Sequence, residues 1–548
     1  MSGHRSRMKV GGMTCGHCEV AVGRALEGAG ARDVEADFRR GEAVFALPEG
    51  AGVEALRRAV REAGYEPGAV ERVGGERVRG GGRHDYDLAI IGSGGGAFAA
   101  AIRAVERGAR VAMIERGTVG GTCVNVGCVP SKTLLRGAEI YHRAGHHPFE
   151  GVRTKALAAD YGAMVAQKDR LVGRMRQEKY LDLVEEYGWE LIRGEAAFED
   201  EGTLRVEGRR ISAAAYLIAT GARPAVPPIP GLEEAGYLTS TTNMELEEAP
   251  ESVLVIGAGY VAIEQGQLLS RLGSRVTLMQ RGPRLLREQE PEVSEAMMEA
   301  LRREGIEVLT GVRIERAGKT EKGKKRLHLA VGGEERVLEG EEILVAAGRR
   351  PNVEELGLER AGVELDERGA VRVDGRLGTT NPRVWAAGDV TLGPQYVYVA
   401  AYEGALAADN ALGGAGREVD LSALPGVIFS DPQVASVGLT ERRARERGLE
   451  VQSSVLPLEA VPRALVNHDT LGVIKLVAEA GTGRLLGAHM VAENAGDVIY
   501  AATLAVRFGL TVSDLAENFA PYLTMSEGLK LAAQAFGRDV SRLSCCAA

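Results

Sequence analysis

The six cysteines of this 548-residue chain fall into three close pairs, and paired thiols are the side chains here best suited to chemistry. The pairs are Cys15/Cys18, Cys123/Cys128 and Cys545/Cys546. A secreted disulfide scaffold spreads many cysteines through a short chain, whereas this chain is long and poor in cysteine. In a reducing compartment, close pairs indicate soft-metal sites or redox sites.

The middle pair lies within the stretch Gly-Gly-Thr-Cys-Val-Asn-Val-Gly-Cys-Val-Pro-Ser-Lys at residues 120–132. Two thiols with four residues between them, at the start of a helix, can close a small disulfide ring. The helix dipole and Lys132 favour a thiolate there. Two buried structural cysteines are the alternative, but the glycines and the proline around the pair argue against it. We therefore predict that Cys123 and Cys128 form a redox-active pair.

The two outer pairs suit a soft metal ion. In Gly12-Met13-Thr14-Cys15-Gly16-His17-Cys18, two thiols share one loop and helix start, which fits a two-coordinate ion, with a thioredoxin-type redox site as the alternative. His17 is interpreted as a solvated loop residue rather than a third ligand. The adjacent Cys545 and Cys546 can form only a strained disulfide ring, whereas on a flexible tail both can bind one soft ion. Terminal residues without a role are the alternative for this last pair.

A strand–turn–helix–strand pattern before the middle pair predicts a dinucleotide site. The strand at 87–91 runs into G-x-G-x-x-A, formed by Gly92, Gly94 and Ala97. These small residues allow a tight turn, the approach of a pyrophosphate and close helix packing, and the helix start offers N–H groups to the phosphates. Glu115 ends the next strand 23 residues after Gly92, where a carboxylate can accept hydrogen bonds from ribose hydroxyls.

The same pattern recurs at residues 252–280, with its small residues at Gly257, Gly259 and Ala262. Gln280 stands where the first copy has its acid, and Arg281 and Arg284 follow. Guanidinium groups in place of a carboxylate favour the 2′-phosphate of NADPH over NADH, although these arginines are also compatible with a merely solvated surface. We predict two Rossmann-like nucleotide-binding domains in one chain.

Composition sets the wider organisation. With 45% hydrophobic and 26% charged residues, the chain is globular rather than disordered. A net charge of −9 without a basic stripe disfavours a nucleic-acid partner. The chain contains no long apolar run, and its first residues lack the apolar core of a secretory signal, so we expect a cytoplasmic protein without stable membrane insertion.

The predicted fold class is mixed α/β and α+β, with several domains. Residues 1–73 follow the β-α-β-β-α-β order of a ferredoxin-like fold, and alternating strands and helices after residue 421 indicate a separate α+β domain. The predicted segments are a metal-binding domain (1–73), a linker (74–84), a first nucleotide-binding part (85–235), a second nucleotide-binding domain (236–350), a return to the first (351–420), and a dimerisation domain with the Cys-Cys tail (421–548).

Over residues 85–540 the chain resembles the FAD-dependent pyridine nucleotide–disulfide oxidoreductases. The resemblance rests on the Cys123/Cys128 stretch and on the motifs Ala219-Thr220-Gly221 and Ala386-Ala387-Gly388-Asp389. It implies FAD on the first module, with Glu264 pairing with Lys132 beside the flavin. It also implies that Cys128 faces the flavin and that Cys123 is the outward, exchanging thiol. The further positions that it implies around FAD are Gly117, Thr122, Ala196, Thr220, Gly221, Asp389 and Val397.

One departure from this family concerns the substrate. Members that reduce dithiols carry a His-Pro-Thr-x-Ser-Glu signature, and here Tyr522 stands at the histidine position. A phenol with a pKa near ~10 is a poor proton shuttle at neutral pH, so the usual dithiol substrates are disfavoured.

The amino-terminal loop resembles that of the heavy-metal-associated domain, over about 70 residues. All these features together resemble the branch of the family that reduces mercury ions. That resemblance implies Hg(II), delivered on thiols, as the substrate, and a homodimer in which the Cys545/Cys546 tail serves the partner subunit. Tyr260 and Tyr522 match its tyrosines beside the metal, although Tyr260 also fits a cover over the flavin. The alternatives are a dihydrolipoamide-type disulfide reductase and a metal-binding chaperone whose flavin module is silent.

Overall fold

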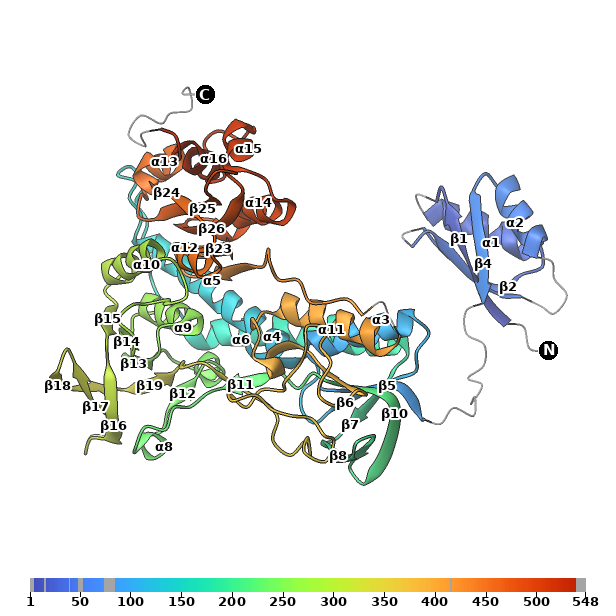
Figure 1. Cartoon of the computed structure of the whole chain (residues 1–548), viewed down its shortest axis with the longest axis horizontal. Coiled ribbons are helices and arrows are strands. Elements are labelled where there is room, and N and C mark those ends of the chain that lie inside the picture. Colours follow the sequence, from blue (N-terminus) through green and yellow to red (C-terminus); the bar gives the residue numbers. More distant parts are fainter. Residues whose placement is uncertain are drawn as a thin grey trace. The chain divides into compact units, whose positions relative to one another are not determined.

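The computed structural model of the chain describes residues 4–13, 16–38, 40–47, 53–72, 84–413 and 416–538. The chain divides into two compact units, residues 1–83 and 84–548 (Figure 1). Cys15, Cys545 and Cys546 lie outside the described residues, as does nearly all of the predicted linker. Within the described ranges, no helix is long and apolar enough to cross a membrane.

The first unit is a four-stranded antiparallel sheet in the order β2-β3-β1-β4, with two helices. Alternation along β1 buries Met8 and Val10 and exposes Lys9 between them, as one-sided burial of a strand requires. Leu56 and Val60 of α2 lie four residues apart and enter the same core. This order confirms the ferredoxin-like prediction. The elements are β1 (His4–Gly11), α1 (Gly16–Gly28), β2 (Arg32–Asp37), β3 (Glu42–Leu47), α2 (Val53–Glu62) and β4 (Glu66–Arg72).

The second unit begins with a seven-stranded sheet in the order β7-β6-β5-β10-β9-β8, in which β21 also pairs with β10. The strands β5, β6, β7, β10 and β21 run parallel, and β5 and β6 are apolar and almost wholly buried because helices cover the sheet. The strands are β5 (Tyr86–Ile91), β6 (Val111–Glu115), β7 (Glu190–Arg193), β8 (Ala196–Asp200), β9 (Thr203–Val206), β10 (Arg209–Ile218) and β21 (Val384–Ala386), with a small ladder of β11 (Ala222–Pro224) and β20 (Arg349–Pro351) nearby.

The helices around this sheet carry the predicted redox pair and one nucleotide turn. In Figure 1, α3 and α11 lie side by side, and α4 and α5 follow one another. The helices are α3 (Gly95–Glu106), α4 (Gly121–Val126), α5 (Cys128–Gly145), α6 (Tyr161–Arg176), the π-helical turn η1 (Gln177–Leu181), α7 (Asp182–Tyr187), the 3₁₀ turn η3 (Gly388–Thr391) and α11 (Val397–Ala411).

A buried carboxylate ties α3 to α11. Asp409 of α11, with 7% of its side chain exposed, accepts hydrogen bonds from Arg103 of α3, from Arg107 directly after α3, and from Arg417. These guanidinium groups, Arg103 foremost, lower the pKa of Asp409 to about 2. Because residues about 300 positions apart in sequence meet here, the cluster joins the two parts of the first nucleotide-binding region.

We expect Asp409→Asn to lower the free energy of unfolding by about 1–2 kcal/mol at pH 7, since the arginines are partly exposed and screened. The pKa of Asp409 lies below that of an unfolded aspartate, near ~3.9, so its stabilising effect is complete above about pH 4 and is lost as the pH falls towards 2. Urea unfolding at several pH values measures this. Glu106→Gln, which removes an exposed partner of the same Arg103, is the control, and an equal loss in both variants would refute the assignment.

A second nucleotide-binding sheet has five parallel strands in the order β12-β19-β13-β14-β15. A separate antiparallel sheet, β16-β17-β18, packs beside it. The elements are α8 (Leu232–Ala235), β12 (Leu238–Thr239), η2 (Thr242–Glu245), β13 (Ser252–Ile256), α9 (Tyr260–Arg271), β14 (Arg275–Gln280), α10 (Pro291–Arg303), β15 (Glu307–Thr310), β16 (Arg313–Lys319), β17 (Lys325–Val331), β18 (Glu334–Gly340) and β19 (Glu342–Val345).

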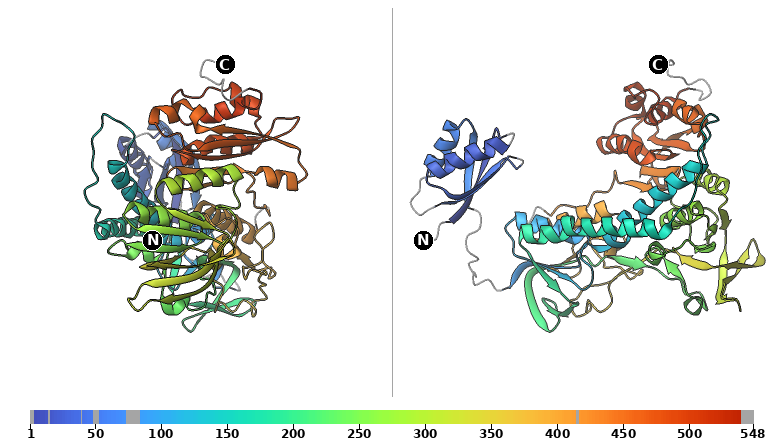
Figure 2. Two further views of the ribbon diagram at one scale, coloured as in Figure 1. Left: turned by 90° about the vertical axis from the view of Figure 1, so that its left-hand side faces the viewer. Right: turned by 180° about the vertical axis from the view of Figure 1, so that it is seen from behind.

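The last part of the chain is an antiparallel sheet, β22-β23-β26-β25-β24, packed against helices (Figure 2). The mixed α/β and α+β fold class is therefore as predicted, while the domain boundaries at 235/236, 350/351 and 420/421 stay predictions. The elements are β22 (Pro425–Ile428), β23 (Gln433–Gly438), α12 (Glu441–Glu446), β24 (Val451–Pro457), η4 (Leu458–Ala460), α13 (Pro462–Asn467), β25 (Val473–Glu479), β26 (Leu485–Ala492), α14 (Ala495–Phe508), α15 (Val512–Glu517) and α16 (Glu527–Gln534).

Candidate active site

Both nucleotide turns are built so that only glycine fits at their first position. Gly92 has a φ of 110°, and a Cβ added there would lie 2.3 Å from the carbonyl oxygen of Ala219. Gly257 has a φ of 121°, and its Cβ would lie 2.3 Å from the carbonyl oxygen of Ala346. In each turn the helix that follows begins three residues later, so its free N–H groups face the turn. Both turns therefore have the backbone geometry that a phosphate site needs, and phosphate binding by them stays a prediction.

The polar groups around the first turn fit FAD. Glu115 ends β6 and accepts hydrogen bonds from the Ser93 hydroxyl at 2.5 Å and from the Gly117 amide at 2.6 Å, so its carboxylate is fixed beside the turn. Asp389 is mostly buried, 3.5 Å from Arg349 Nε, and burial raises its pKa. A buried carboxylate of this kind is stabilised by hydroxyl donors, which the ribityl chain of a flavin supplies.

Other predicted FAD positions surround the same turn. A Cβ on Gly95 would meet the Val397 side chain at 2.9 Å, so the start of α11 lies against the start of α3. The Thr220 hydroxyl donates a hydrogen bond to the Asn352 carbonyl at 2.7 Å. The backbone N–H of Asn352 in turn donates to the Gly221 carbonyl. The remaining positions keep their predicted places: Gly94 as the N-cap of α3, Ala97 buried in α3, Thr122 in α4 and Ala196 buried at the start of β8.

The two thiols of the middle pair meet where α4 ends and α5 begins. Cys123 is half-buried in α4, and Cys128 is exposed as the first residue of α5. A hydrogen bond from Cys123, assisted by the charge of Lys132, lowers the pKa of Cys128 to about 7. The same bond raises the pKa of Cys123. At neutral pH Cys128 is therefore partly ionised while Cys123 keeps its proton, so the negative charge of the pair lies on Cys128.

A charge pair fixes Lys132 one turn further along α5. Its ammonium lies 2.7 Å from the Glu264 carboxylate of α9, which is the predicted pairing. Glu264 also accepts the backbone N–H of Phe429 at 2.9 Å, and the Lys132 ammonium lies 4.8 Å from the centre of the Phe429 ring. The cation is thus held by a carboxylate and by an aromatic face. Sequence reasoning did not find Phe429, since nothing in its surroundings forms a motif.

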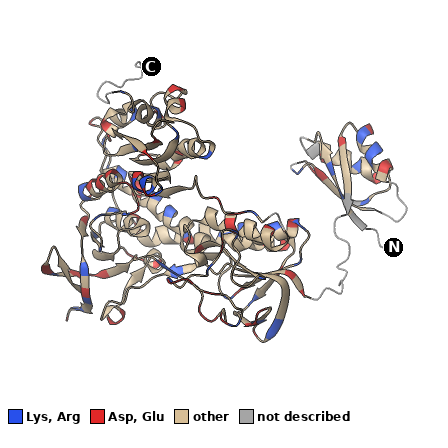
Figure 3. Cartoon of the chain, viewed as in Figure 1, with Lys and Arg blue, Asp and Glu red and all other residues tan. Residues whose placement is uncertain are grey.

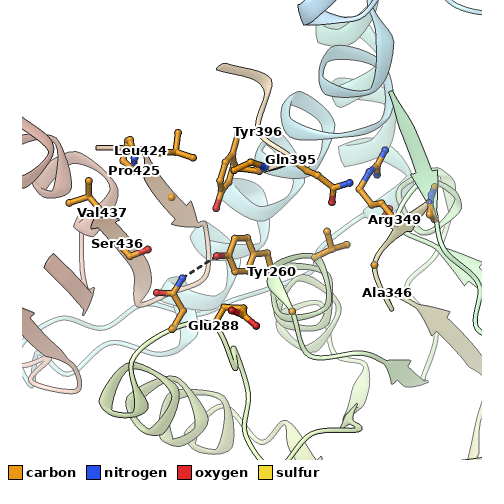
Figure 4. Close-up of a pocket in the computed structure, with 18 of the residues that line it drawn as sticks. Tyr260, Glu288, Ala346, Arg349, Gln395, Tyr396, Leu424, Pro425, Ser436 and Val437 are labelled. Atoms are coloured by element: carbon orange, nitrogen blue, oxygen red, sulfur yellow. Dashed lines mark hydrogen bonds between the residues drawn. The ribbon is translucent and has the colours of Figure 1, made fainter. Parts of the chain in front are cut away.

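A pocket of about 520 Å³ opens at the second nucleotide turn (Figure 4). Gly259 and Tyr260 of the turn line it, and Tyr260 points into it. Ala262 is buried in the helix behind, as close helix packing requires. Arg281 is exposed just after β14, whereas Arg284 is half-buried and donates to the carbonyls of Arg287 and Gln289. Arg284 therefore shapes the wall of the pocket, and the 2′-phosphate role that we predicted for both arginines stays a prediction.

Comparison with known proteins agrees with this site. Family models match the pyridine nucleotide-disulphide oxidoreductases at residues 86–404, their dimerisation domain at 424–533 and the heavy-metal-associated domain at 7–66. The mercuric reductase of Staphylococcus aureus is 56% identical over 100% of both chains. That of Lysinibacillus sphaericus is 53% identical over 99% of this chain and 100% of its own. The chain belongs to the mercuric reductase family.

As a member of the mercuric reductase family, the chain is a flavoprotein oxidoreductase that uses FAD and NADPH. A solved structure outside that family shares the fold: the Cu(II) complex of the HOCl-induced flavoprotein disulfide reductase RclA from Escherichia coli. It is 31% identical, with a TM-score of 0.73, over 82% of this chain and 99% of that chain.

Of the tyrosines near the mercuric reductase site, sequence reasoning missed Tyr180. It lies in the π-helical turn between α6 and α7, and π-helical turns are frequent at functional sites. Burial raises its pKa, and the nearby charges of Cys123 and Cys128 raise it further. Its ring packs edge-to-face on Phe98, with 4.8 Å between the ring centres. The surrounding Gln-Glu-Lys-Tyr-Leu has no motif that would have marked it.

The two tyrosines that we did single out lie elsewhere. Tyr260 is in the coenzyme pocket, and Tyr522 is 57% exposed in the segment before α16. In the first unit, Cys18 is half-buried in α1 and packs against the core that contains Met13. Among the described residues, no three His, Cys, Asp or Glu side chains gather as a metal site.

Proposed function

We propose that this chain reduces Hg(II) to Hg(0) with electrons from NADPH, and that Cys123 and Cys128 hold the ion while it is reduced. The observation that carries the proposal is the neighbouring thiol pair, with the pKa of Cys128 lowered to about 7. Soft metal ions prefer thiolates to nitrogen or oxygen ligands, and the pair presents two sulfur atoms from one short segment. FAD, when bound, passes two electrons from NADPH to this site.

The chain's own residues prepare the pair for the ion. Cys123, the outward thiol in our prediction, receives the ion by exchange, and Cys128, with a pKa of about 7, supplies a sulfur that is already partly ionised at neutral pH. Cys123 loses its proton as its Hg–S bond forms, and Lys132 offsets the negative charge that accumulates. When Hg(II) has gained two electrons, the metal leaves and both thiolates remain. Tyr180 is near enough to both sulfur atoms for their charges to raise its pKa, so it belongs to the surroundings of the ion.

We further propose that Hg(II) arrives by exchange between thiols. Cys15 and Cys18 capture it, Cys545 and Cys546 accept it, and the tail delivers it to Cys123 and Cys128. Each transfer replaces one Hg–S bond by another, so the ion is never bare. The tail and Tyr522 act at the site of the partner subunit in a homodimer. The dimerisation-domain match and the exposed aromatic side chains of Tyr500 (64%), Phe508 (72%) and Phe519 (98%) support a homodimer.

A cytoplasmic location is part of the proposal. The reaction consumes NADPH, and the six cysteines work as thiols or exchange partners, which a reducing compartment maintains. A dihydrolipoamide-type reductase is the alternative activity, and Tyr522 argues against it because a phenol replaces the imidazole that protonates the leaving thiolate.

The test is NADPH consumption by the holoenzyme in the presence of Hg(II) bound to a small thiol, with mercury vapour measured in the headspace. The proposal requires one mercury atom released for each NADPH consumed, and little turnover of dihydrolipoamide or glutathione disulfide. NADPH oxidation that does not depend on Hg(II) would contradict it.

We expect the double substitution Cys15→Ala and Cys18→Ala to leave the rate within about twofold when a small thiol carrier is in excess, because other thiols then deliver the ion. At low free thiol the same variant is expected to fall several-fold behind the intact chain. Steady-state rates across a thiol titration measure this. Loss of turnover even with excess carrier would show that the first unit does more than deliver the metal.

A further inference from the structure

The coenzyme pocket contains a hydrogen bond that spans two of its walls. The Gln289 side-chain amide donates to the Tyr260 hydroxyl at 3.0 Å, drawn as a dashed line in Figure 4. Tyr260 is the first residue of α9, directly after the glycine turn that receives the pyrophosphate of the coenzyme. Its ring also packs against Tyr396, with 6.4 Å between ring centres and 29° between their planes. The tyrosine is therefore held on two sides.

The position of Tyr396 shows that the Tyr260 ring lies between the coenzyme turn and the flavin side of the site. Tyr396 is the N-cap of α11, and the next residue, Val397, packs on the start of the FAD-side helix α3. The Tyr260 ring thus lies between the turn that binds the coenzyme phosphates and the helix start beside the flavin position. A nicotinamide ring extending from those phosphates towards the flavin meets this ring first.

Gln289 itself is held in place by charged groups on both sides of it. Figure 3 shows ribbon coloured for both basic and acidic residues where α10 and α12 lie. Lys475 is 3% exposed at its side chain, so its bond to this segment is well shielded from water. The anchors are Arg284 to the Gln289 carbonyl at 3.1 Å, Arg443 to Glu288 at 2.8 Å, Lys475 to Glu290 at 3.1 Å, and the Glu441 amide to Glu290 at 2.6 Å.

We propose that Gln289 is a latch that holds the Tyr260 ring across the coenzyme pocket and thereby weakens the binding of NADPH. Glu288 and Glu290, on either side of Gln289, are anchored to the dimerisation domain, so the backbone that carries the amide is fixed and the Tyr260 ring is the part that we expect to move. Coenzyme binding has to break the bond, and the apparent affinity is reduced by the fraction of molecules that are latched. Gln289 is therefore a positioning residue for Tyr260.

Gln289→Leu tests the latch in the full-length holoenzyme. The dissociation constant of NADP⁺ is expected to fall by about two- to tenfold, the range that one hydrogen bond accounts for. The dissociation constant of 2′,5′-ADP is expected to stay unchanged, because this fragment fills the adenosine end and has no nicotinamide. Gln452→Leu, which changes an exposed glutamine of β24, is the matched control and should move neither value.

A double-mutant cycle with Tyr260→Phe identifies the bond itself. Tyr260→Phe removes the same hydrogen bond from its other end, so it should tighten the binding of NADP⁺ as Gln289→Leu does. The double variant should bind NADP⁺ no more tightly than either single variant. Three results would overturn the proposal. They are an unchanged dissociation constant of NADP⁺ in Gln289→Leu, a higher dissociation constant in that variant, and fully additive effects in the double variant. Equal tightening of NADP⁺ and 2′,5′-ADP would also overturn it, since that would place the effect in the shared adenosine end.

Discussion

Cys128→Ala is expected to lower Hg(II)-dependent NADPH oxidation by about three orders of magnitude or more, as the loss of one member of a catalytic unit does. The variant removes the more readily ionised sulfur of the pair, since the pKa of Cys128 is lowered to about 7. It leaves one sulfur atom, so the ion loses the second of its two ligands. FAD should remain bound, because the Gly92 turn and the Asp389 carboxylate do not depend on this side chain. Mercury vapour and NADPH absorbance together measure the loss.

Cys18→Ala is the matched control for this result, since it removes a half-buried thiol in the other unit. With excess carrier thiol it should stay close to the intact chain. The flavin absorbance of each variant reports whether FAD is retained, and Cys128→Ser keeps the size and polarity of the site in case alanine disturbs the start of α5. More than a tenth of the original rate in a Cys128 variant that retains FAD would mean that the ion is reduced elsewhere.

The parts of the site that the sequence predicted are those with short, rigid spacing. The two glycine turns were predictable because a φ above 100° and a backbone oxygen 2.3 Å from the missing Cβ leave glycine as the one residue that fits. The Cys123/Cys128 pair was predictable because both thiols lie within six residues of each other. The fixed spacing from the glycine turn likewise located Glu115 at the end of β6.

The parts that the sequence could not supply depend on contacts between distant segments. Lys132 and Glu264 were paired through resemblance, but Phe429, which completes their site, is 165 positions from Glu264 and carries no motif. Tyr180 lies near the charges of the two thiols, in a π-helical turn that no propensity rule predicts. Gln289 meets Tyr260 because buried charges in a third part of the chain hold its segment. Such placements follow from packing, which the one-dimensional pattern does not contain.

A glycine-to-alanine change in the middle of a helix usually stabilises a protein by about 0.5–1 kcal/mol, yet we expect Gly404→Ala in α11 to destabilise this one by about 1–3 kcal/mol. A Cβ on Gly404 would lie 2.0 Å from the carbonyl oxygen of Gly96 in α3, so the two helices have to move apart. Their separation would strain the Asp409 cluster and shift the start of α3, whose N–H groups we predict to bind the FAD phosphates. Thermal unfolding and the fraction of FAD retained after gel filtration measure both effects.

The matched control is Gly173→Ala in α6, also a helix-interior glycine, where an added Cβ would meet nothing within 4 Å. It should raise the melting temperature slightly through helix propensity alone. If glycine-to-alanine lowers the stability in α11 and raises it in α6, the close approach of α3 and α11 is the cause of the loss. If Gly404→Ala were as stable as Gly173→Ala and kept its FAD, the helices would have room to spare, and the nucleotide turn would not depend on how closely α11 packs against it.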